Sequence, residues 1–242
     1  MDAVPTVDYR FTSRRPGWTA LPADVRSEVG RLAGSEVLRA EPVVTSGFTG
    51  SYAGIVHCVD GARVFVKAGG PESPHVREAL EQEARVLAGL PPGIPAPALV
   101  GSAAVGEWRV LVLAVVDGHQ PGQPWTPAEV EAARAACTAI TGLATTAPAG
   151  LAPCSVVEDI GGDERVVAVG AALAAGRFDV PGGMPPWPLQ RQREVGTLVL
   201  AAGGRLGGET LTHGDLRPDN ILVDAAGKAW VLDWNWVGRG PA

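Results

Sequence analysis

Three polar residues near the carboxyl end of the sequence have the types and spacing to bind a cation and act on a hydroxyl group. Asp215 and Asn220 lie five positions apart in a proline-containing loop, which leads into the apolar segment 221–223. A turn at 224–227 precedes a second apolar segment, 229–232, and folding the two as a hairpin brings Asp233 back beside Asn220. A carboxylate and an amide oxygen suit Mg²⁺, while Asp215 stays close enough to orient or deprotonate a hydroxyl.

The segment 213–223, which reads HGDLRPDNILV, resembles the kinase signature H-x-D-x-x-x-x-N that is followed by a metal-binding Asp. With Gly after the His, and Asp-Trp in place of Asp-Phe-Gly, it is similar to the aminoglycoside phosphotransferase family of small-molecule kinases. The resemblance implies ATP and Mg²⁺ as cofactors and a hydroxyl of a small molecule as the acceptor of the γ-phosphate. It implies that Asp215 orients that hydroxyl, that Asn220 and Asp233 bind the metal ion, and that His213 supports the structure of the loop.

The same resemblance assigns phosphate binding to a lysine in the first half of the chain. Lys67 ends the segment Val-Phe-Val-Lys, where such kinases place the lysine that holds the α- and β-phosphates, and an acidic residue on the next helix pairs with it. Glu78, Glu81 and Glu83 compete for that second role. We prefer Glu83, because it shares a helix face with the leucines at 80, 87 and 90, whereas Glu81 lies about 160° away from it.

The nucleotide's other contacts are expected at two loops. Backbone amides of Thr49, Gly50 and Ser51, in the glycine-containing stretch 47–54, are candidates for binding phosphate oxygens. Val115 and Val116 follow an apolar segment that resembles the hinge whose backbone reads adenine in kinases.

The elements that must position these residues predict an α+β fold. We expect a β-rich N-lobe with one key helix and a mainly helical C-lobe, together forming a two-lobed protein-kinase-like fold. The predicted parts are a lead-in and helix at 1–34, a nucleotide-binding N-lobe at 35–117, and a C-lobe at 118–242 that carries the catalytic loop and the metal-binding hairpin. The expected strands are 38–45, 53–59, 63–68, 98–103 and 108–116. The expected helices are one at 24–32, one that begins at Ser73-Pro74 and one at 126–144 that begins with a capping box, and helical stretches are expected near 163–175 and 187–203.

Composition excludes several other classes. The 242 residues are 46% hydrophobic, which is ample for a core, and 20 basic against 26 acidic residues give a net charge of −6, unlike a nucleic-acid binder. Three scattered cysteines without CxxC spacing argue against a structural zinc site. With no signal pattern and no run near the ~18 apolar residues of a membrane helix, we expect a cytoplasmic protein with no membrane partner, a monomer or a homodimer.

Two functions from different classes fit the sequence. The first is a kinase whose acceptor is an antibiotic such as an aminoglycoside, or a metabolite of choline-like, homoserine-like or sugar-like chemistry, with ATP and GTP both open as donors. The second is a non-catalytic nucleotide-binding remnant: the sequence ends nine residues after Asp233, where the family continues into helices that wall the substrate pocket, so a truncated or minimal member is expected. A protein kinase is disfavoured, because no activation segment is recognisable.

The sequence places other polar and aromatic residues in lesser roles. Arg217 and Asp219 are expected to form loop ion pairs or face solvent, and Trp234 and Trp236 are expected to pack on a terminal strand. Asp159, Asp163 and Glu164 are candidate substrate contacts by charge alone.

Overall fold

The computed structural model describes residues 12–44, 49–152, 154–158, 162–179 and 190–241. The chain divides into two compact units. Among the described residues, the sheet unit comprises those within 12–140 and 215–236, and the helical unit comprises those within 141–214 and 237–241. This division follows packing rather than sequence order, and the three consecutive ranges expected from the sequence stay a prediction.

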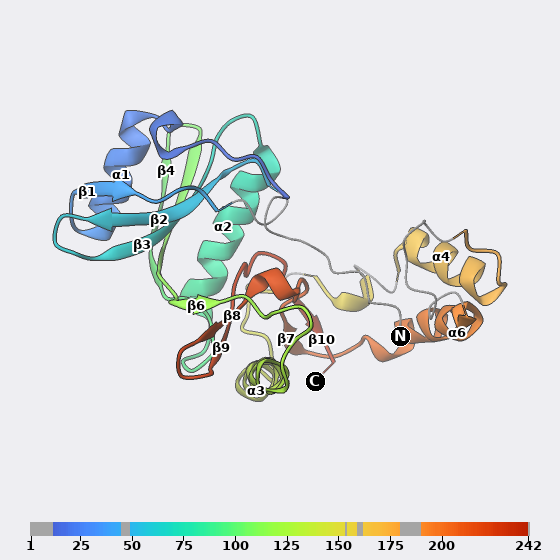
Figure 1. Ribbon diagram of the computed structural model, residues 1–242. Helices are drawn as coiled ribbons and strands as arrows, with labels where there is room; N and C mark the ends of the chain where they lie inside the picture. Colours follow the sequence, from blue (N-terminus) through green and yellow to red (C-terminus); the bar gives the residue numbers. More distant parts are fainter. Residues whose placement is uncertain (1–11, 45–48, 153, 159–161, 180–189, 242) are drawn as a thin grey trace. The chain divides into compact units, whose positions relative to one another are not determined.

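The sheet unit is built on a five-stranded antiparallel sheet (Figure 1). Its strands lie in the order β1-β2-β3-β5-β4, and β3 therefore pairs with β2 on one side and β5 on the other. The strands are β1 (Val37–Ala40), β2 (Tyr52–Cys58), β3 (Arg63–Gly69), β4 (Leu99–Val105) and β5 (Trp108–Ala114). The first strand ends at Ala40, before the expected end at residue 45, which lies outside the described residues, although the backbone N–H groups of Glu41 and Val44 still donate to the carbonyls of Ile55 and Ala53.

Alternation along the strands divides the apolar residues between two helices on opposite faces of the sheet (Figure 1). Val64 and Val66 of β3 pack with α1 (Ala23–Ala33), whereas Phe65 packs with α2 (Pro74–Gly89). Since successive side chains of a strand point to opposite faces, Lys67 shares the α2 face with Phe65. The period of β3 thus decides which helix can supply a partner for the lysine.

The segment that carries the predicted metal ligands forms a second, three-stranded sheet in the same unit. Its order is β6 (Gly118–His119), β8 (Ile221–Asp224) and β9 (Ala229–Val231). The turn between β8 and β9 is held by Asp224, whose Oδ1 accepts from the backbone N–H groups of Ala226 and Lys228 and whose Oδ2 accepts from Trp230 Nε1. The predicted hairpin is therefore present.

Helix α3 (Pro127–Leu143) opens with the predicted capping box. The backbone N–H of Thr126 donates to Glu129 Oε2 at 2.6 Å, and the backbone N–H of Glu129 donates to Thr126 Oγ1 at 3.3 Å. Each side chain thus satisfies a backbone donor that a helix start leaves without an intrahelical partner. Ser73 precedes α2 as expected, but its side chain makes no capping hydrogen bond.

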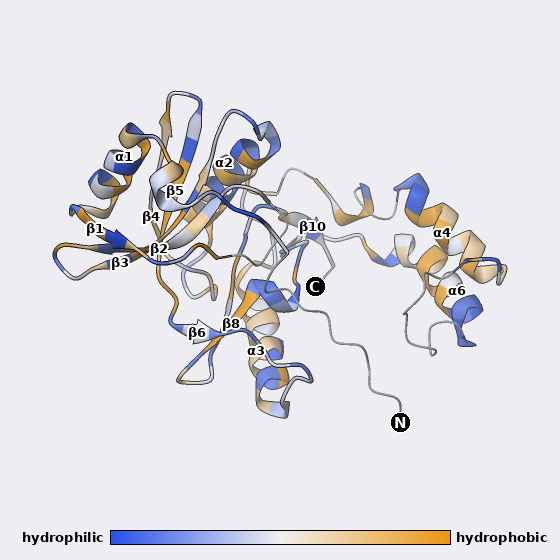
Figure 2. Ribbon diagram, turned by 45° about the horizontal axis from the view of Figure 1, so that its top comes forward, coloured by the Kyte–Doolittle hydropathy of each residue, from blue (hydrophilic) through white to orange (hydrophobic). Residues whose placement is uncertain are grey.

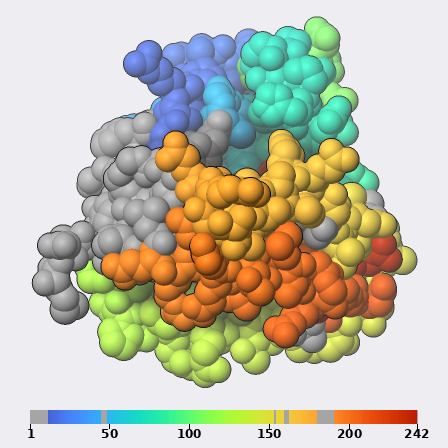
Figure 3. All heavy atoms as spheres, turned by 90° about the vertical axis from the view of Figure 1, so that its right-hand side faces the viewer, coloured from blue at the N-terminus to red at the C-terminus, as the bar shows by residue number. Residues whose placement is uncertain are grey.

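The helical unit contains α4 (Glu164–Ala174) and α6 (Gln192–Ala202), which lie side by side (Figure 3). Gly196 stands at the closest approach, because a Cβ there would lie 2.1 Å from the backbone nitrogen of Ala174. Figure 2 shows apolar residues along both helices. The unit also pairs β7 (Thr210–Thr212) with β10 (Gly238–Gly240).

The mixture of helices with antiparallel sheets confirms the predicted α+β class. Within the described residues, none of the helices combines the length and the apolar character that crossing a membrane would require.

Candidate active site

Lys67 stands at the centre of a three-residue ionic network in the sheet unit. Its Nζ donates to Glu83 Oε1 at 2.9 Å, to Glu83 Oε2 at 2.7 Å and to Asp233 Oδ1 at 2.7 Å. The three residues come from β3, α2 and the segment after β9, and 166 positions separate Lys67 from Asp233. The fold thus joins the first-half lysine to the carboxyl-terminal motif through direct contacts.

Burial makes the charges of this network depend on one another. Burial opposes the charge of Lys67, but Asp233 and Glu83 outweigh it and raise the pKa of the lysine above its ordinary value. Glu83 has none of its surface exposed, and this burial raises its pKa although Lys67 acts in the opposite direction. The carboxylate of Glu83 therefore relies on the ammonium of Lys67 to remain ionised.

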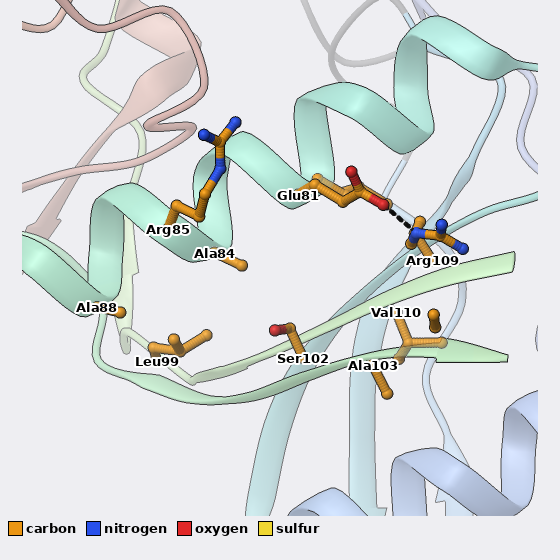
Figure 4. A pocket seen from close by; sticks show the side chains of 11 residues that line it. Glu81, Ala84, Arg85, Ala88, Leu99, Ser102, Ala103, Arg109 and Val110 are labelled. Carbon is orange, nitrogen blue, oxygen red and sulfur yellow. Dashed lines mark hydrogen bonds and ion pairs between the residues drawn. The ribbon is translucent and has the colours of Figure 1, made fainter. Parts of the chain in front are cut away.

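Figure 4 shows why the other candidate on α2 is not available to Lys67. Glu81 faces a hollow between α2 and strands β4 and β5, where its carboxylate accepts from Arg109 Nε. Glu78 is exposed. The structure therefore places Glu83, the residue preferred from the helix period, against the lysine.

The hairpin determines where Asp233 lies. Ile221 pairs with Val231 in the β8–β9 register, and the N–H of Leu232 donates to the carbonyl of Asn220 at 2.8 Å. Asp233 follows directly with a φ of 66°, a left-handed conformation that is uncommon outside glycine and that Asp tolerates better than most residues. The left-handed conformation that follows β9 thus points the carboxylate of Asp233 away from the strand and toward Lys67.

Asp215 is held by two neighbours in its own loop. Arg217 Nη1 donates to both of its carboxylate oxygens, at 2.8 and 2.7 Å, and Asn220 Nδ2 donates to its Oδ2 at 3.2 Å and to its backbone carbonyl at 2.8 Å. Arg217 also bonds both oxygens of the buried Asp219, which is the chief cause of the raised pKa of this guanidinium. Arg217 and Asp219 therefore form the expected ion pairs, and one of them includes Asp215.

A cavity of about 420 Å³ brings these groups together with an apolar wall, and all of its lining lies in the sheet unit. Thr49 and Ser51 line it, and so do Val115 and Val116, which follow β5. Gly50 lies between Thr49 and Ser51 but not in the lining, and residues 47 and 48 of the predicted loop fall outside the described residues. The apolar lining residues include Ala53, Ile55, Phe65, Leu80, Leu113, Leu222 and Leu232.

Sequence reasoning missed Arg15, which belongs to the lead-in predicted within residues 1–34. Its Nη1 donates to Ser51 O at 2.8 Å, Thr49 Oγ1 at 3.0 Å and Ser51 Oγ at 3.2 Å, and it lines the cavity. No spacing or motif marks this arginine, because its partners lie 34 and 36 positions away.

Trp236 corrects another expectation. Residues 234–236 form a turn and a bend rather than the expected terminal strand. Trp234 is fully buried and its Nε1 donates to Val231 O at 2.8 Å, in line with the expected packing. Trp236 is 69% exposed and lines the cavity, so the expected packing role is wrong for this residue.

Two of the three charged residues near 160 that the sequence offered as substrate contacts, Asp163 and Glu164, lie in the helical unit. Asp163 caps α4, where its Oδ1 accepts from the Arg165 backbone N–H, and Glu164 is exposed in the first turn. Asp159 falls outside the described residues. A capping role thus accounts for the position of Asp163.

The donor set of the site suits some cations and not others. Among the residues that the structure describes, no group of three or more His, Cys, Asp or Glu side chains is arranged to hold a metal ion. Asn220 and Asp233 instead offer an amide and a carboxylate, and Asn220 uses its amide nitrogen on Asp215, so its oxygen is the end that remains to accept. A site with only two protein ligands, both of them oxygen atoms, suits Mg²⁺, because this cation usually keeps water molecules and substrate phosphates among its ligands.

Comparisons with known proteins agree on one family. A family model described as the phosphotransferase enzyme family (APH) matches residues 55–242. A comparison with curated protein sequences found no match.

Three solved structures illustrate the shared fold. An aminoglycoside-3'-phosphotransferase of type VIII is 22% identical, with a TM-score of 0.54 over 90% of this chain and 77% of that one. A macrolide 2'-phosphotransferase, MphH from Brachybacterium faecium, is 20% identical, with a TM-score of 0.57 over 91% and 74%. A streptomycin–ATP complex of APH(2")-IIa is 14% identical, with a TM-score of 0.53 over 91% and 73%. With the family model covering most of the chain, this protein belongs to the phosphotransferase enzyme family and is a small-molecule kinase of protein-kinase-like fold.

Proposed function

We propose that this kinase transfers the γ-phosphate of ATP, in the presence of Mg²⁺, to a hydroxyl group of a small molecule. The observation that carries the proposal is the simultaneous contact of Lys67 with Glu83 and Asp233 inside a cavity that has an apolar wall. Apolar side chains can pack against the base of a nucleotide. A fixed ammonium group can bind its phosphates, and a neighbouring carboxylate can bind the cation that accompanies them. ATP as the donor is further supported by the ATP present in the complex of the APH(2")-IIa relative.

Lys67 would hold the α- and β-phosphates, and Glu83 would fix the direction of its ammonium group. The two oxygens of Glu83 take two of the donors of Nζ, which limits rotation of the head group. The backbone of Thr49, Gly50 and Ser51 would contact phosphate oxygens, and the backbone of Val115 and Val116 would contact the base. Most of the catalytic effect in such a site comes from positioning and charge neutralisation.

Asn220 and Asp233 would hold Mg²⁺ through their oxygens. The cation, when bound, would supply positive charge that neutralises negative charge on the phosphates during transfer. Lys67 already holds Asp233 through one carboxylate oxygen, Oδ1. The same residue can thus connect the lysine and the cation.

Asp215 would orient the acceptor hydroxyl and accept its proton as the oxygen attacks. The side chain of Asp215 is 25% exposed and lines the cavity, so a substrate can reach it. Arg217 and Asn220 hold the carboxylate in one orientation, which prepares it for a hydroxyl in a defined position.

The acceptor would be a neutral or cationic molecule rather than an anionic one. The cavity lining contains Glu83, Asp215, Asp219 and Asp233 against Arg15, Lys67 and Arg217, so four carboxylates face three cations. Aminoglycosides fit this balance, and so do choline-like or sugar-like metabolites.

Calorimetric titration with a non-hydrolysable ATP analogue, with and without Mg²⁺, tests the first half of the proposal. We expect Mg²⁺-dependent binding that Asp233→Ala abolishes, while Asp117→Asn, at an exposed carboxylate, leaves it unchanged. If the folded protein does not bind the analogue, the proposal fails.

Transfer of labelled γ-phosphate to panels of aminoglycosides, macrolides and hydroxylated metabolites tests the second half. We expect transfer to at least one acceptor, reduced by about 10²-fold or more in Asp215→Asn, since general base contributions are of that size. Nucleotide binding without transfer to any acceptor would favour the non-catalytic module instead.

A further inference from the structure

We propose that Arg15 is a phosphate-positioning residue that holds the Thr49–Ser51 loop and adds a cation to the phosphate end of the cavity. This inference rests on the function proposed above and adds to it a residue from outside the two motifs. Arg15 precedes the sheet in sequence, yet its side chain reaches the segment that leads into β2.

Three hydrogen bonds place the guanidinium group. Nη1 donates to the carbonyl of Ser51 at 2.8 Å, to the hydroxyl of Thr49 at 3.0 Å and to the hydroxyl of Ser51 at 3.2 Å. The two hydroxyls also lie 3.1 Å apart and bond to each other. Arg15 therefore fastens both ends of a three-residue segment whose backbone is expected to contact phosphate.

The charge of Arg15 is a second reason for a role in phosphate positioning. Burial lowers the pKa of Arg15 and Asp233 raises it, so the arginine lies within the electrostatic reach of the predicted metal ligand. A guanidinium remains protonated in proteins, and the cavity therefore keeps this positive charge at every working pH. With Arg15 the lining carries three cations against four carboxylates, and without it two against four.

An anionic ligand would respond strongly to that difference. A triphosphate entering a lining with two excess negative charges meets more repulsion than one entering a lining with a single excess charge. Arg is also suited to phosphate because its planar fork presents several donors at once. The predicted ligand of Arg15 is the triphosphate of the nucleotide, either directly or through the loop that it holds.

The matched control is the neighbouring residue. Arg14 is exposed and does not line the cavity, so Arg14→Gln removes the same charge from the same segment without touching the site. Arg15→Gln keeps a planar donor but loses the charge, and Arg15→Lys keeps the charge but loses the fork.

Calorimetry on the full chain with Mg²⁺ and a non-hydrolysable ATP analogue, and separately with adenosine, tests the proposal. We expect Arg15→Gln to weaken binding of the analogue by about tenfold or more, the range of a charge-assisted hydrogen bond, while adenosine affinity changes by less than about twofold. Arg15→Lys should recover part of the loss, and Arg14→Gln should match the unmodified protein. In turnover assays the KM for ATP should rise while the KM for the acceptor stays unchanged.

Two results would overturn the inference. Analogue binding by Arg15→Gln as tight as that of the unmodified protein would remove any phosphate role, and an equal loss for analogue and adenosine would show that Arg15 acts only as a structural brace. If Arg15→Gln does not fold, Arg15→Lys decides between the same outcomes. Failure of the unmodified protein to bind the analogue would instead refute the proposed function itself.

Discussion

Replacing Lys67 by methionine tests the charge balance at the centre of the site. In the variant, the fully buried Glu83 loses the ammonium that now donates to both of its oxygens at 2.9 and 2.7 Å. Removing one partner of a buried ion pair costs about 3–5 kcal/mol, because the other charge stays buried without compensation. We expect Lys67→Met to lower the free energy of unfolding by about this amount at pH 8.

Lys67→Met should reduce the free energy of unfolding less at acidic pH than at pH 8. Burial already raises the pKa of Glu83, and loss of Lys67 removes a contribution that lowers it. A carboxyl group whose pKa is higher in the folded than in the unfolded state stabilises the fold below the unfolded value of about 4.3, and this contribution is lost as the pH rises. The free energy of unfolding of the variant should therefore fall by up to about 1.4 kcal/mol per pH unit, relative to the unmodified protein, between the already raised folded pKa of Glu83 in the unmodified protein and its higher folded pKa in the variant.

Urea unfolding followed by tryptophan fluorescence at pH 5.5 and pH 8 measures both effects. Lys228→Met is the control, since Lys228 is exposed, lies 3.8 Å from the centre of the Trp230 ring and should cost only about 0.5–1 kcal/mol. The double variant Lys67→Met/Glu83→Gln should lose the added pH dependence. The reasoning is refuted if Lys67→Met costs the same at both pH values, or if the double variant keeps the pH dependence.

Three further predictions concern stability. Gly196→Ala should lower the free energy of unfolding by about 1–3 kcal/mol, because a Cβ there would lie 2.1 Å from a backbone nitrogen of α4. Gly204→Ala is the control in thermal unfolding, since a Cβ at that position meets nothing within 4 Å. Equal shifts in Tm for the two variants would contradict the close packing at Gly196. The backbone N–H of Thr126, followed by that of Gly122, lowers the pKa of Glu129 to about 2, so this carboxylate stabilises the fold above its unfolded pKa of about 4.3 and loses that effect as the pH falls toward 2. The stability difference between the unmodified protein and Glu129→Gln should thus shrink between pH 5 and pH 3, and a difference independent of pH would count against the capping box. Trp234→Ala should cost about 3–5 kcal/mol as a buried aromatic, whereas Trp236→Ala, 69% exposed, should stay within about 0.5 kcal/mol; similar losses in urea unfolding would show that the exposure of Trp236 is wrong.

The sequence by itself determined the longer helices and strands and the local motifs, whereas the short strands β6, β7 and β10 were not predicted. The hairpin that returns Asp233 to Asn220 follows from two short apolar segments around a turn, and the strand period places Lys67 on the face opposite Val66. The helix period separates Glu83 from Glu81, and the Thr126–Glu129 capping box is visible in four consecutive residues. These features depend on neighbours within a few positions, which a sequence pattern records.

Only the tertiary structure decided which distant groups meet. The direct bond from Lys67 to Asp233 spans 166 positions, and the bonds from Arg15 to Ser51 span 36, with no motif around the arginine to announce them. Trp236 is exposed because β9 ends at Val231 and residues 234–236 form a turn and a bend, which the sequence pattern did not indicate. Such contacts arise when packed elements bring their surfaces together, and packing depends on the whole chain rather than on any local period.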